Sequence, residues 1–236
     1  MMNMFDYISV LAGGTCKANC FFCVGKSIRK KKPPYFATEP QFEIFLSTYG
    51  RLAKKMSISG STSDPILIDS KILLNYIKKS KASGLKTSIH TCILNLDSEK
   101  IKILKAADAI VLSVHNLNDI DFVNEITNRL KNDKIRISSV CSSENIDMIQ
   151  GRDFYESFKA ERFTVRKNVF EKIEPIIPYP ETGEKIFNQP VFSDGNKRIA
   201  LWDFKDANKY IDARYLWPDG QMRHQCYWSN LHKVNK

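Results

Sequence analysis

Three cysteines lie close together near the start of the chain, where three residues separate Cys16 from Cys20 and two separate Cys20 from Cys23. One loop with this spacing can place three thiolates around a single metal unit. Soft thiolates select zinc or iron-sulfur clusters. The chemistry predicted for this loop is therefore metal binding of one of these two kinds.

Zinc and an iron-sulfur cluster differ in the ligands they need. A structural zinc site is closed by four ligands, so a further Cys or His would have to lie near the loop. The next candidates, His90, Cys92 and His115, are far along the chain and have no paired spacing. Three thiolates without an evident fourth ligand favour a cluster with one open iron, and zinc stays the alternative.

With Phe22 before the last cysteine, the loop resembles the hallmark of the radical S-adenosylmethionine superfamily. The resemblance implies that Cys16, Cys20 and Cys23 hold a four-iron, four-sulfur (4Fe-4S) cluster, whose fourth iron binds S-adenosylmethionine. It also implies reductive cleavage of this cofactor to a 5'-deoxyadenosyl radical that abstracts hydrogen from a substrate. The implied fold is α/β, a partial (βα)6 TIM-type barrel over about two-thirds of the chain.

A second segment carries the same resemblance. The superfamily has a Gly-Gly-Glu-Pro-like motif after its second strand, which binds the amine of the cofactor's methionine part. Here Asp64 takes the place of the acid, and hydroxyl side chains surround a single glycine. The candidate cofactor-binding residues are Ser59, Gly60, Ser61, Thr62 and Asp64. An ordinary Ser/Thr turn that caps a helix is the alternative.

Polar residues at the ends of later strands could complete the cofactor site, because ligands of barrel-like α/β proteins bind at the carboxyl ends of the strands. Arg166 could pair with the cofactor carboxylate, and Ser113 could bond the ribose or the carboxylate. His115 and Ser139 end neighbouring strands, and His90 could face the substrate. A solvated or structural role is the alternative for each.

Short β-branched runs alternate with helical stretches up to about residue 167, which predicts repeated βα units around a parallel sheet. Strands are expected at residues 6–11, 56–59, 86–90, 109–114, 135–140 and 162–165. Helices are expected at about residues 38–55, 69–83, 98–107, 120–130 and 145–159.

The sequence changes character after residue 174, where four prolines and Gly183 indicate a connecting segment. Strands at residues 198–204 and 213–217 are expected to follow, and the chain should return through residues 222–228 as a hairpin. The predicted organisation is a barrel core at residues 1–174 and an extension at residues 175–236 that packs on it within the same domain. We expect the hairpin to close the open end of the partial barrel and to offer Trp217, Tyr227 and Trp228 to the substrate.

The bulk composition suits one catalytic domain. The chain has 236 residues, of which 43% are hydrophobic and 26% charged, so it can bury a sizeable core. It has no apolar run long enough for a membrane span and no secretory signal, which predicts a cytoplasmic protein without a membrane partner.

The formal net charge of +10 allows several partners. Lys17, Lys26 and the basic run at residues 29–32 could steer an acidic electron donor such as flavodoxin or ferredoxin to the cysteine loop. The substrate could be an anionic small molecule, a nucleotide, a base in RNA or a peptide. From a different class, the chain could be a non-catalytic zinc module that binds nucleic acid.

Overall fold

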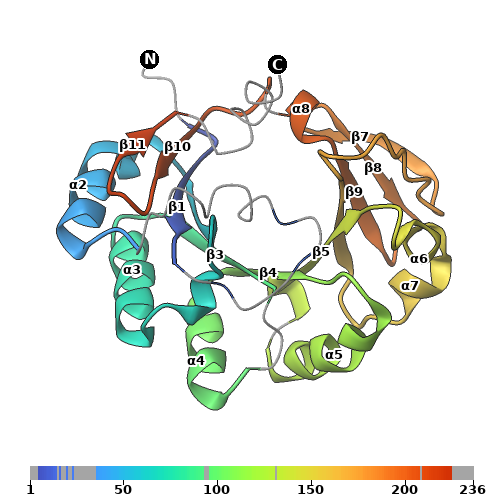
Figure 1. Cartoon of the computed structure of the whole chain (residues 1–236), viewed down its shortest axis with the longest axis horizontal. Coiled ribbons are helices and arrows are strands. Elements are labelled where there is room, and N and C mark those ends of the chain that lie inside the picture. Colours follow the sequence, from blue (N-terminus) through green and yellow to red (C-terminus); the bar gives the residue numbers. More distant parts are fainter. Residues whose placement is uncertain are drawn as a thin grey trace. The chain divides into compact units, whose positions relative to one another are not determined.

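The computed structural model describes residues 5–14, 16, 20, 23, 36–92, 96–130, 132–207 and 209–224. The chain divides into two compact units, one formed by residues 1–110 with 212–236 and the other by residues 111–211 (Figure 1). Strand β4 (Ala109–Ser113) crosses this division. The predicted boundary between a core at residues 1–174 and an extension at residues 175–236 stays a prediction.

The first unit is built on strands whose side chains are largely buried. These strands are β1 (Tyr7–Ala12), β2 (Lys55–Gly60), β3 (Lys86–Thr91), β10 (Ala213–Leu216) and β11 (Met222–Arg223). β1 pairs in parallel with β2, and β2 pairs in parallel with β3, so that Ile58 faces both Val10 and Ile89. On its other side β1 pairs in parallel with β10, which β11 joins as an antiparallel partner. The predicted hairpin therefore extends the sheet beside β1.

Five helices are described in the first unit, and an aspartate side chain caps the start of some of them. They are α2 (Glu39–Tyr49), η2 (Gly50–Leu52), η3 (Pro65–Leu67), α3 (Ser70–Ala82) and α4 (Ser98–Ala106). Asp69 accepts from the backbone of α3, and Asp97 accepts from that of α4. Tyr76 on α3 packs against Phe42 on α2, with ring centroids 3.9 Å apart, and donates to the Ala37 carbonyl at 2.5 Å.

The prediction that the helix after residue 38 continues to residue 55 is wrong. The α-helix ends at Tyr49, and a short 3-10 turn begins at Gly50. A Cβ atom on Gly50 would lie 3.1 Å from the Leu46 side chain, so this turn packs tightly against the helix. Lys55 already belongs to β2, whose Met56 and Ile58 are fully buried. Burial of these two side chains in the sheet outweighs the helical tendency of the preceding residues.

The second unit holds a mixed sheet. Its strands are β5 (Ile135–Cys141), β6 (Arg162–Lys167), β7 (Glu181–Ile186), β8 (Gln189–Ser193) and β9 (Arg198–Trp202). β5 pairs in parallel with β6, and β6 pairs in parallel with β9. β8 then pairs antiparallel with β9, and β7 pairs antiparallel with β8. The end of β4 is tied to β5, because Val114 N donates to Ser138 O at 2.9 Å.

The helices of the second unit are short. They are η4 (Leu117–Asp119), α5 (Ile120–Arg129), η5 (Asn132–Lys134), α6 (Ile146–Gln150), α7 (Arg152–Glu156) and α8 (Phe204–Ala207). The prediction of one helix at residues 145–159 is wrong, because the chain forms α6 and α7 in its place. Gly151 separates them with an extended backbone, at φ −79° and ψ 132°.

The prediction of an irregular connecting segment is also wrong for residues 181–193, which form the β7–β8 hairpin. Phe187 and Asn188 form its turn with φ angles of 48° and 62°. A two-residue turn with positive φ at both positions matches the twist of a hairpin and usually contains glycine. Because Phe187 stands where glycine is usual, the sequence does not indicate this turn. Pro190 lies near the start of β8, opposite Lys185 at the irregular register of the β7–β8 pairing, and strand starts and bulges are positions that tolerate proline.

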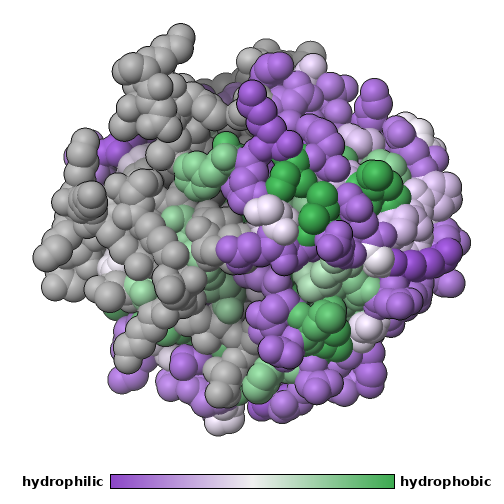
Figure 2. Space-filling view, turned by 45° about the vertical axis from the view of Figure 1, so that its right-hand side comes forward, coloured by the Kyte–Doolittle hydropathy of each residue, from purple (hydrophilic) through white to green (hydrophobic). Residues whose placement is uncertain are grey.

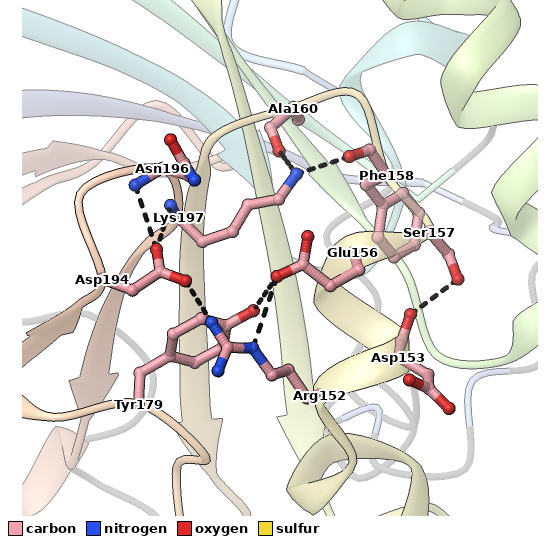
Figure 3. Close-up of polar contacts among 10 residues, drawn as sticks. All are labelled: Arg152, Asp153, Glu156, Ser157, Phe158, Ala160, Tyr179, Asp194, Asn196 and Lys197. Carbon is pink, nitrogen blue, oxygen red and sulfur yellow. Dashed lines mark hydrogen bonds and ion pairs between the residues drawn. The ribbon is translucent and has the colours of Figure 1, made fainter.

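A polar cluster joins α7 to the turn between β8 and β9 (Figure 3). Arg152 on α7 forms ion pairs with Asp194 and Glu156, and its guanidinium lies 4.8 Å from the centroid of the Tyr179 ring. Tyr179 donates to the Glu156 carboxylate at 2.9 Å. Lys197 is buried, and its amine donates to the carbonyl oxygens that follow α7.

One face of the described residues is mainly polar. Figure 2 shows one face on which hydrophilic side chains surround separate hydrophobic patches. Exposed apolar side chains of the second unit include Leu117, Phe122 and Ile176. Among the residues with a described structure, no helix is long and apolar enough to cross a membrane. The alternation of parallel strands and helices confirms the predicted α/β class.

Candidate functional site

The cysteine loop begins at the carboxyl end of β1, a strand whose residues from Ile8 to Ala12 are almost fully buried. Cys16, Cys20 and Cys23 are half-buried free thiols, and Cys23 N donates to Cys20 O at 3.2 Å. Within the described ranges, no three His, Cys, Asp or Glu side chains converge on a point that could hold a single metal ion. A cubane cluster has no such requirement, since it takes each thiolate on a different iron. The donor set of three thiols therefore fits a 4Fe-4S cluster.

The base of this loop is fixed to the segment that follows β2. Ser61 N and Thr62 N both donate to Ala12 O, at 2.9 and 3.3 Å. Gly14 N donates to the Thr62 hydroxyl at 3.2 Å, and Thr62 is buried. Thr62, a predicted cofactor contact, thus also determines where the cysteine loop leaves the sheet.

The turn after β2 requires a glycine at position 60. A Cβ atom on Gly60 would lie 2.6 Å from Ser63 O, which is closer than real contacts allow, so the turn would have to shift. The Ser59 hydroxyl lies 3.5 Å from that of Ser9 on β1. The Ser61 hydroxyl is buried and has no hydrogen-bond partner among the described residues. A buried hydroxyl without a partner carries a free-energy cost that a bound ligand could remove.

Asp64 is the most deeply buried acid of this region, with 4% of its surface exposed. Its Oδ1 accepts from Ile66 N and from the Thr91 hydroxyl, both at 2.9 Å. Its Oδ2 accepts from Cys92 N at 2.7 Å. Burial raises the pKa of this carboxyl, and the hydrogen bonds partly counteract that rise. Asp64 therefore joins the end of β2 to the end of β3, and its contact with a cofactor stays a prediction.

Cys92 is a member of this site that the sequence reasoning did not assign to the cluster loop. The neighbouring Cys20 side chain, burial and the charge of the Asp64 carboxylate raise the pKa of the Cys92 thiol. The signal in the sequence is its position directly after β3, at the same end of the sheet as the cysteine loop. His90, two residues earlier, is half-buried, and its Nε2 lies 3.5 Å from the Ser88 hydroxyl.

The second unit brings another set of predicted residues to its own strand ends. Ser113 ends β4, and Arg166 lies near the end of β6, opposite Val140 on β5. His115 is half-buried with both ring nitrogens shielded from solvent, and burial and the positive charge of Arg166 lower the pKa of His115 to about 3. The Ser139 hydroxyl is buried without a hydrogen-bond partner in the described part of the chain. This end of the unit therefore offers a cation, a neutral imidazole and a hydroxyl that a polar ligand could use.

Several predicted residues lie outside the described residues. They are Phe22, Lys17, Lys26, residues 29–32, Tyr227 and Trp228. Trp217, the remaining aromatic residue of the predicted hairpin, is buried, and the Arg223 guanidinium lies 4.0 Å from its ring centroid. Trp217 thus packs within the hairpin, and its contact with a substrate stays a prediction.

No family model matches the chain, and no curated protein is matched by its sequence. Among solved structures, the chain is similar to Streptococcus suis SuiB, with 16% identity and a TM-score of 0.64 over 99% of this chain. It is also similar to SuiB bound to the precursor peptide SuiA, with 16% identity over 99% of this chain and a TM-score of 0.66. A third structure, SuiB bound to S-adenosylmethionine, is matched over 73% of this chain and 42% of SuiB, with 19% identity and a TM-score of 0.52.

The chain covers 62% of the length of the SuiB chain in the first two structures. Identities this low carry the fold alone. The fold predicted from the cysteine loop and the βα alternation is confirmed by this likeness.

Proposed function

We propose that this protein is a radical S-adenosylmethionine enzyme, in which Cys16, Cys20 and Cys23 hold a 4Fe-4S cluster. The enzyme would cleave the cofactor reductively and use the resulting radical to abstract hydrogen from its substrate. One observation carries the proposal: the three thiols lie in a loop after β1 that is hydrogen-bonded to the segment after β2. The likeness to SuiB, of which one structure contains S-adenosylmethionine, gives independent support.

The chain's own residues would hold the cofactor and exclude water from it. When bound, the cluster and S-adenosylmethionine would supply the redox chemistry, a one-electron reductive cleavage of the cofactor. The hydroxyl of Ser61, buried and available, is suited to accept from the cofactor's ammonium group. The proposed cofactor-binding residues of the first unit are Phe22, Ser59, Gly60, Ser61, Thr62 and Asp64.

We also propose cofactor contacts for residues of the second unit. Arg166 is assigned to the carboxylate, because a guanidinium can form two parallel charge-assisted hydrogen bonds with it. His115 beside it stays neutral at physiological pH, since the pKa of His115 is lowered to about 3. Of these two side chains, Arg166 therefore carries the positive charge. Ser113 is assigned to the ribose or the carboxylate.

A peptide or protein is the substrate class that the comparisons support best, because SuiB has been solved with its precursor peptide SuiA. The net charge of +10 supports a second class, anionic small molecules or nucleotides. The five described cysteines are free thiols, which agrees with a protein that works in the reducing cytoplasm.

An acidic flavodoxin or ferredoxin is the proposed electron donor. Neutral replacements for the basic run at residues 29–32 should slow reduction by flavodoxin and leave reduction by dithionite unchanged. Equal rates with both donors in wild type and variant would rule out electrostatic steering by this run.

The deciding experiment is anaerobic reconstitution with iron and sulfide, followed by dithionite and S-adenosylmethionine. We expect 5'-deoxyadenosine from the wild type and none from a variant with Cys16→Ala, Cys20→Ala and Cys23→Ala. Cys141→Ala is a matched control, because it removes a buried thiol on β5 without touching the loop. Wild-type protein that forms no 5'-deoxyadenosine and contains one zinc ion per chain would favour the zinc-binding module.

A further inference from the structure

Three arginines lie side by side at the amino end of the sheet in the second unit. The parallel register pairs Arg136 on β5 with Arg162 on β6, and it pairs Arg162 with Arg198 on β9. Neighbouring strands are about 4.8 Å apart, and residues in register on parallel strands place their side chains on the same face of the sheet. These three residues therefore form one line across three strands, the arginine row.

The arginine row lies on the opposite face of the sheet from α7. The next residue along each strand points to the other face. These next residues are Ile137, Phe163 and Ile199, and each is at most 3% exposed. The Phe163 ring packs edge-on against the ring of Tyr155 on α7, with centroids 5.2 Å apart. The apolar face thus packs on α7, and the arginines belong to the polar face.

One arginine of the row has an acidic partner in the described part of the chain. Arg198 forms an ion pair with Glu184 on β7. With the described residues, neither Arg136 nor Arg162 forms an ion pair or a side-chain hydrogen bond. The amino ends of strands in barrel-like α/β proteins usually serve stability, but like charges directly opposite one another are destabilising. The row therefore presents two positive charges that these residues do not compensate.

The electrostatics of Arg136 agree with this arrangement. Arg136 is exposed to solvent, yet the protein that surrounds it, and next the positive charge of Arg162, lower the pKa of its guanidinium. A lowered pKa of a basic group means that its surroundings disfavour the charged form. A bound anion would reverse this effect, because an opposite charge nearby favours the charged form.

A buried hydroxyl lies next to the row. Thr164 is two residues after Arg162 on β6, so it lies on the same face, about 6.6 Å further along the strand. Thr164 is 8% exposed, and its hydroxyl forms no hydrogen bond with the described residues. A buried polar group without a partner carries a free-energy cost that a ligand could remove. The polar face therefore offers two guanidiniums and a neighbouring hydroxyl to an anion.

The charge and the donors of this group favour a phosphate. A phosphate monoester carries about two negative charges at neutral pH and three strong acceptor oxygens. A carboxylate carries one negative charge and two oxygens. Guanidinium groups bind phosphate through paired, charge-assisted hydrogen bonds. Two uncompensated guanidiniums and one hydroxyl thus match a phosphate monoester better than a carboxylate.

We propose that Arg136, Arg162 and Thr164 bind the phosphate group of a small phosphorylated ligand, with Arg198 at the edge of this site. Arg166 lies on the same face of β6, four residues and about 13 Å beyond Arg162. The anchored ligand extends along this face toward Arg166, which is assigned to the cofactor carboxylate. The role of this ligand as a substrate rests on the proposed function, whereas the binding of phosphate does not.

The test is calorimetric titration of the reconstituted protein at constant ionic strength. Inorganic phosphate and ribose 5-phosphate should bind, and ribose and acetate should not. Arg162→Gln should raise the dissociation constant of ribose 5-phosphate about 10- to 100-fold, because it removes a charge-assisted hydrogen-bond donor. Arg162→Lys keeps the charge without the paired geometry and should give an intermediate value. Arg129→Gln is the matched control, since Arg129 belongs to the same unit but pairs with Glu125 on α5, and it should leave the constant unchanged.

Thermal unfolding gives a second readout. Arg162→Gln removes like-charge repulsion from the row, so without ligand it should unfold at a temperature at least as high as the wild type. Excess inorganic phosphate should raise the unfolding temperature of the wild type more than that of the variant, because only a ligand of the folded state stabilises it. A loss of phosphate binding in a variant that is not destabilised then reports on the site itself.

The outcomes separate this site from general charge attraction and from the proposed function. Equal dissociation constants in wild type and Arg162→Gln would overturn the proposal, and so would an equal loss in Arg129→Gln, since binding would then follow net charge alone. A phosphoserine peptide that binds more tightly than ribose 5-phosphate would refute the small ligand. Protein that binds phosphate but forms no 5'-deoxyadenosine would refute the proposed function alone, whereas 5'-deoxyadenosine formation without phosphate binding refutes this inference alone.

Discussion

Asp64 and Lys197 are both charged groups whose surfaces are almost completely buried, with 4% and 7% exposed. Asp64 follows the carboxyl end of β2 in the first unit, and Lys197 precedes the amino end of β9 in the second. Each satisfies its hydrogen bonds largely on backbone groups. Asp64 accepts from two backbone amides, and Lys197 donates to Phe158 O at 2.6 Å and Ala160 O at 3.1 Å.

The neighbours of the two charges differ in chemistry. Asp64 holds Thr91 and Cys92, and Cys92 neighbours a thiol of the cysteine loop. Lys197 holds the chain after α7 (Figure 3) and lies 5.8 Å from the Phe163 ring. In barrel-like α/β proteins the carboxyl ends of the strands carry the chemistry and the amino ends carry stability. We therefore expect the same physical device, a buried charge that is hydrogen-bonded to the backbone, to serve function in one region and folding in the other.

The largest effect should come from Asp64→Ala. Removing the carboxylate leaves Ile66 N, Cys92 N and the Thr91 hydroxyl without their acceptor in a buried place. Loss of one partner from a buried charged network costs about 3–5 kcal/mol of unfolding free energy. Displacement of the loop by about 1 Å would lower 5'-deoxyadenosine formation about 100-fold. Denaturant unfolding and chromatographic product detection measure the two effects.

Asp64→Asn provides the control, because the amide keeps one acceptor oxygen and nearly the same shape. Its losses should be clearly smaller than those of Asp64→Ala in both measurements. Wild-type product formation in Asp64→Ala would break the comparison, since Asp64 would then serve stability alone.

Lys197→Met should lower stability and spare the chemistry. Methionine fills the space of the lysine stem but leaves the carbonyls of Phe158 and Ala160 without their donor. The unfolding free energy should fall by about 1–3 kcal/mol, while 5'-deoxyadenosine formed per bound cluster stays unchanged. Lys159→Met is the matched control, because the Lys159 amine is exposed and donates to the Asn128 side chain, so its loss should change stability by less than about 0.5 kcal/mol. Loss of the cluster in Lys197→Met would contradict the division of roles.

The pH dependence of the unfolding free energy should also depend on Lys197. Burial lowers the pKa of Lys197 below its ordinary value of 10.5, and the nearby carboxylates partly oppose this. Between the lowered pKa and 10.5 the unfolded chain binds a proton that the folded chain has released, so unfolding free energy rises with pH in this window. The advantage of wild type over Lys197→Met should therefore grow as pH approaches 10.5 and shrink as pH falls through the lowered value. A difference that does not change with pH would show that Lys197 stays charged in the folded protein.

The sequence was sufficient for the parallel strands but not for the β7–β8 hairpin, because each parallel strand is a short run of β-branched and apolar residues that the core buries. The first strand was expected at residues 6–11 and lies at Tyr7–Ala12, and the fifth was expected at 135–140 and lies at Ile135–Cys141. Breaks within helices were harder to predict. Gly50 and Gly151 interrupt helical patterns for reasons that depend on packing and on the local backbone.

The candidate site was only partly accessible to sequence reasoning. The cysteine loop is a local motif, because its three cysteines lie within eight consecutive residues. The proximity of Cys20 and Cys92 depends instead on the parallel register of β1, β2 and β3, which brings the residues after all three strands to one end of the sheet. The use of Asp64 as a link between strands, rather than as a free carboxylate, likewise follows from burial that no short motif encodes.

Ser139→Ala should give the smallest effect, and it sharpens the comparison because its two consequences have opposite signs. The Ser139 hydroxyl is buried with no hydrogen-bond partner within the described residues, unlike Asp64 and Lys197, whose bonds are made. Without S-adenosylmethionine, removing it should raise unfolding free energy by up to about 1 kcal/mol, and the cofactor's dissociation constant should rise by about three- to tenfold. Ser138→Ala is the matched control, since its side chain points to the opposite face of β5 and should leave cofactor affinity unchanged. Calorimetric titration against both variants distinguishes a hydroxyl kept for a ligand from one that is merely tolerated, since a stabilised variant with unchanged affinity would show that Ser139 has no part in cofactor binding.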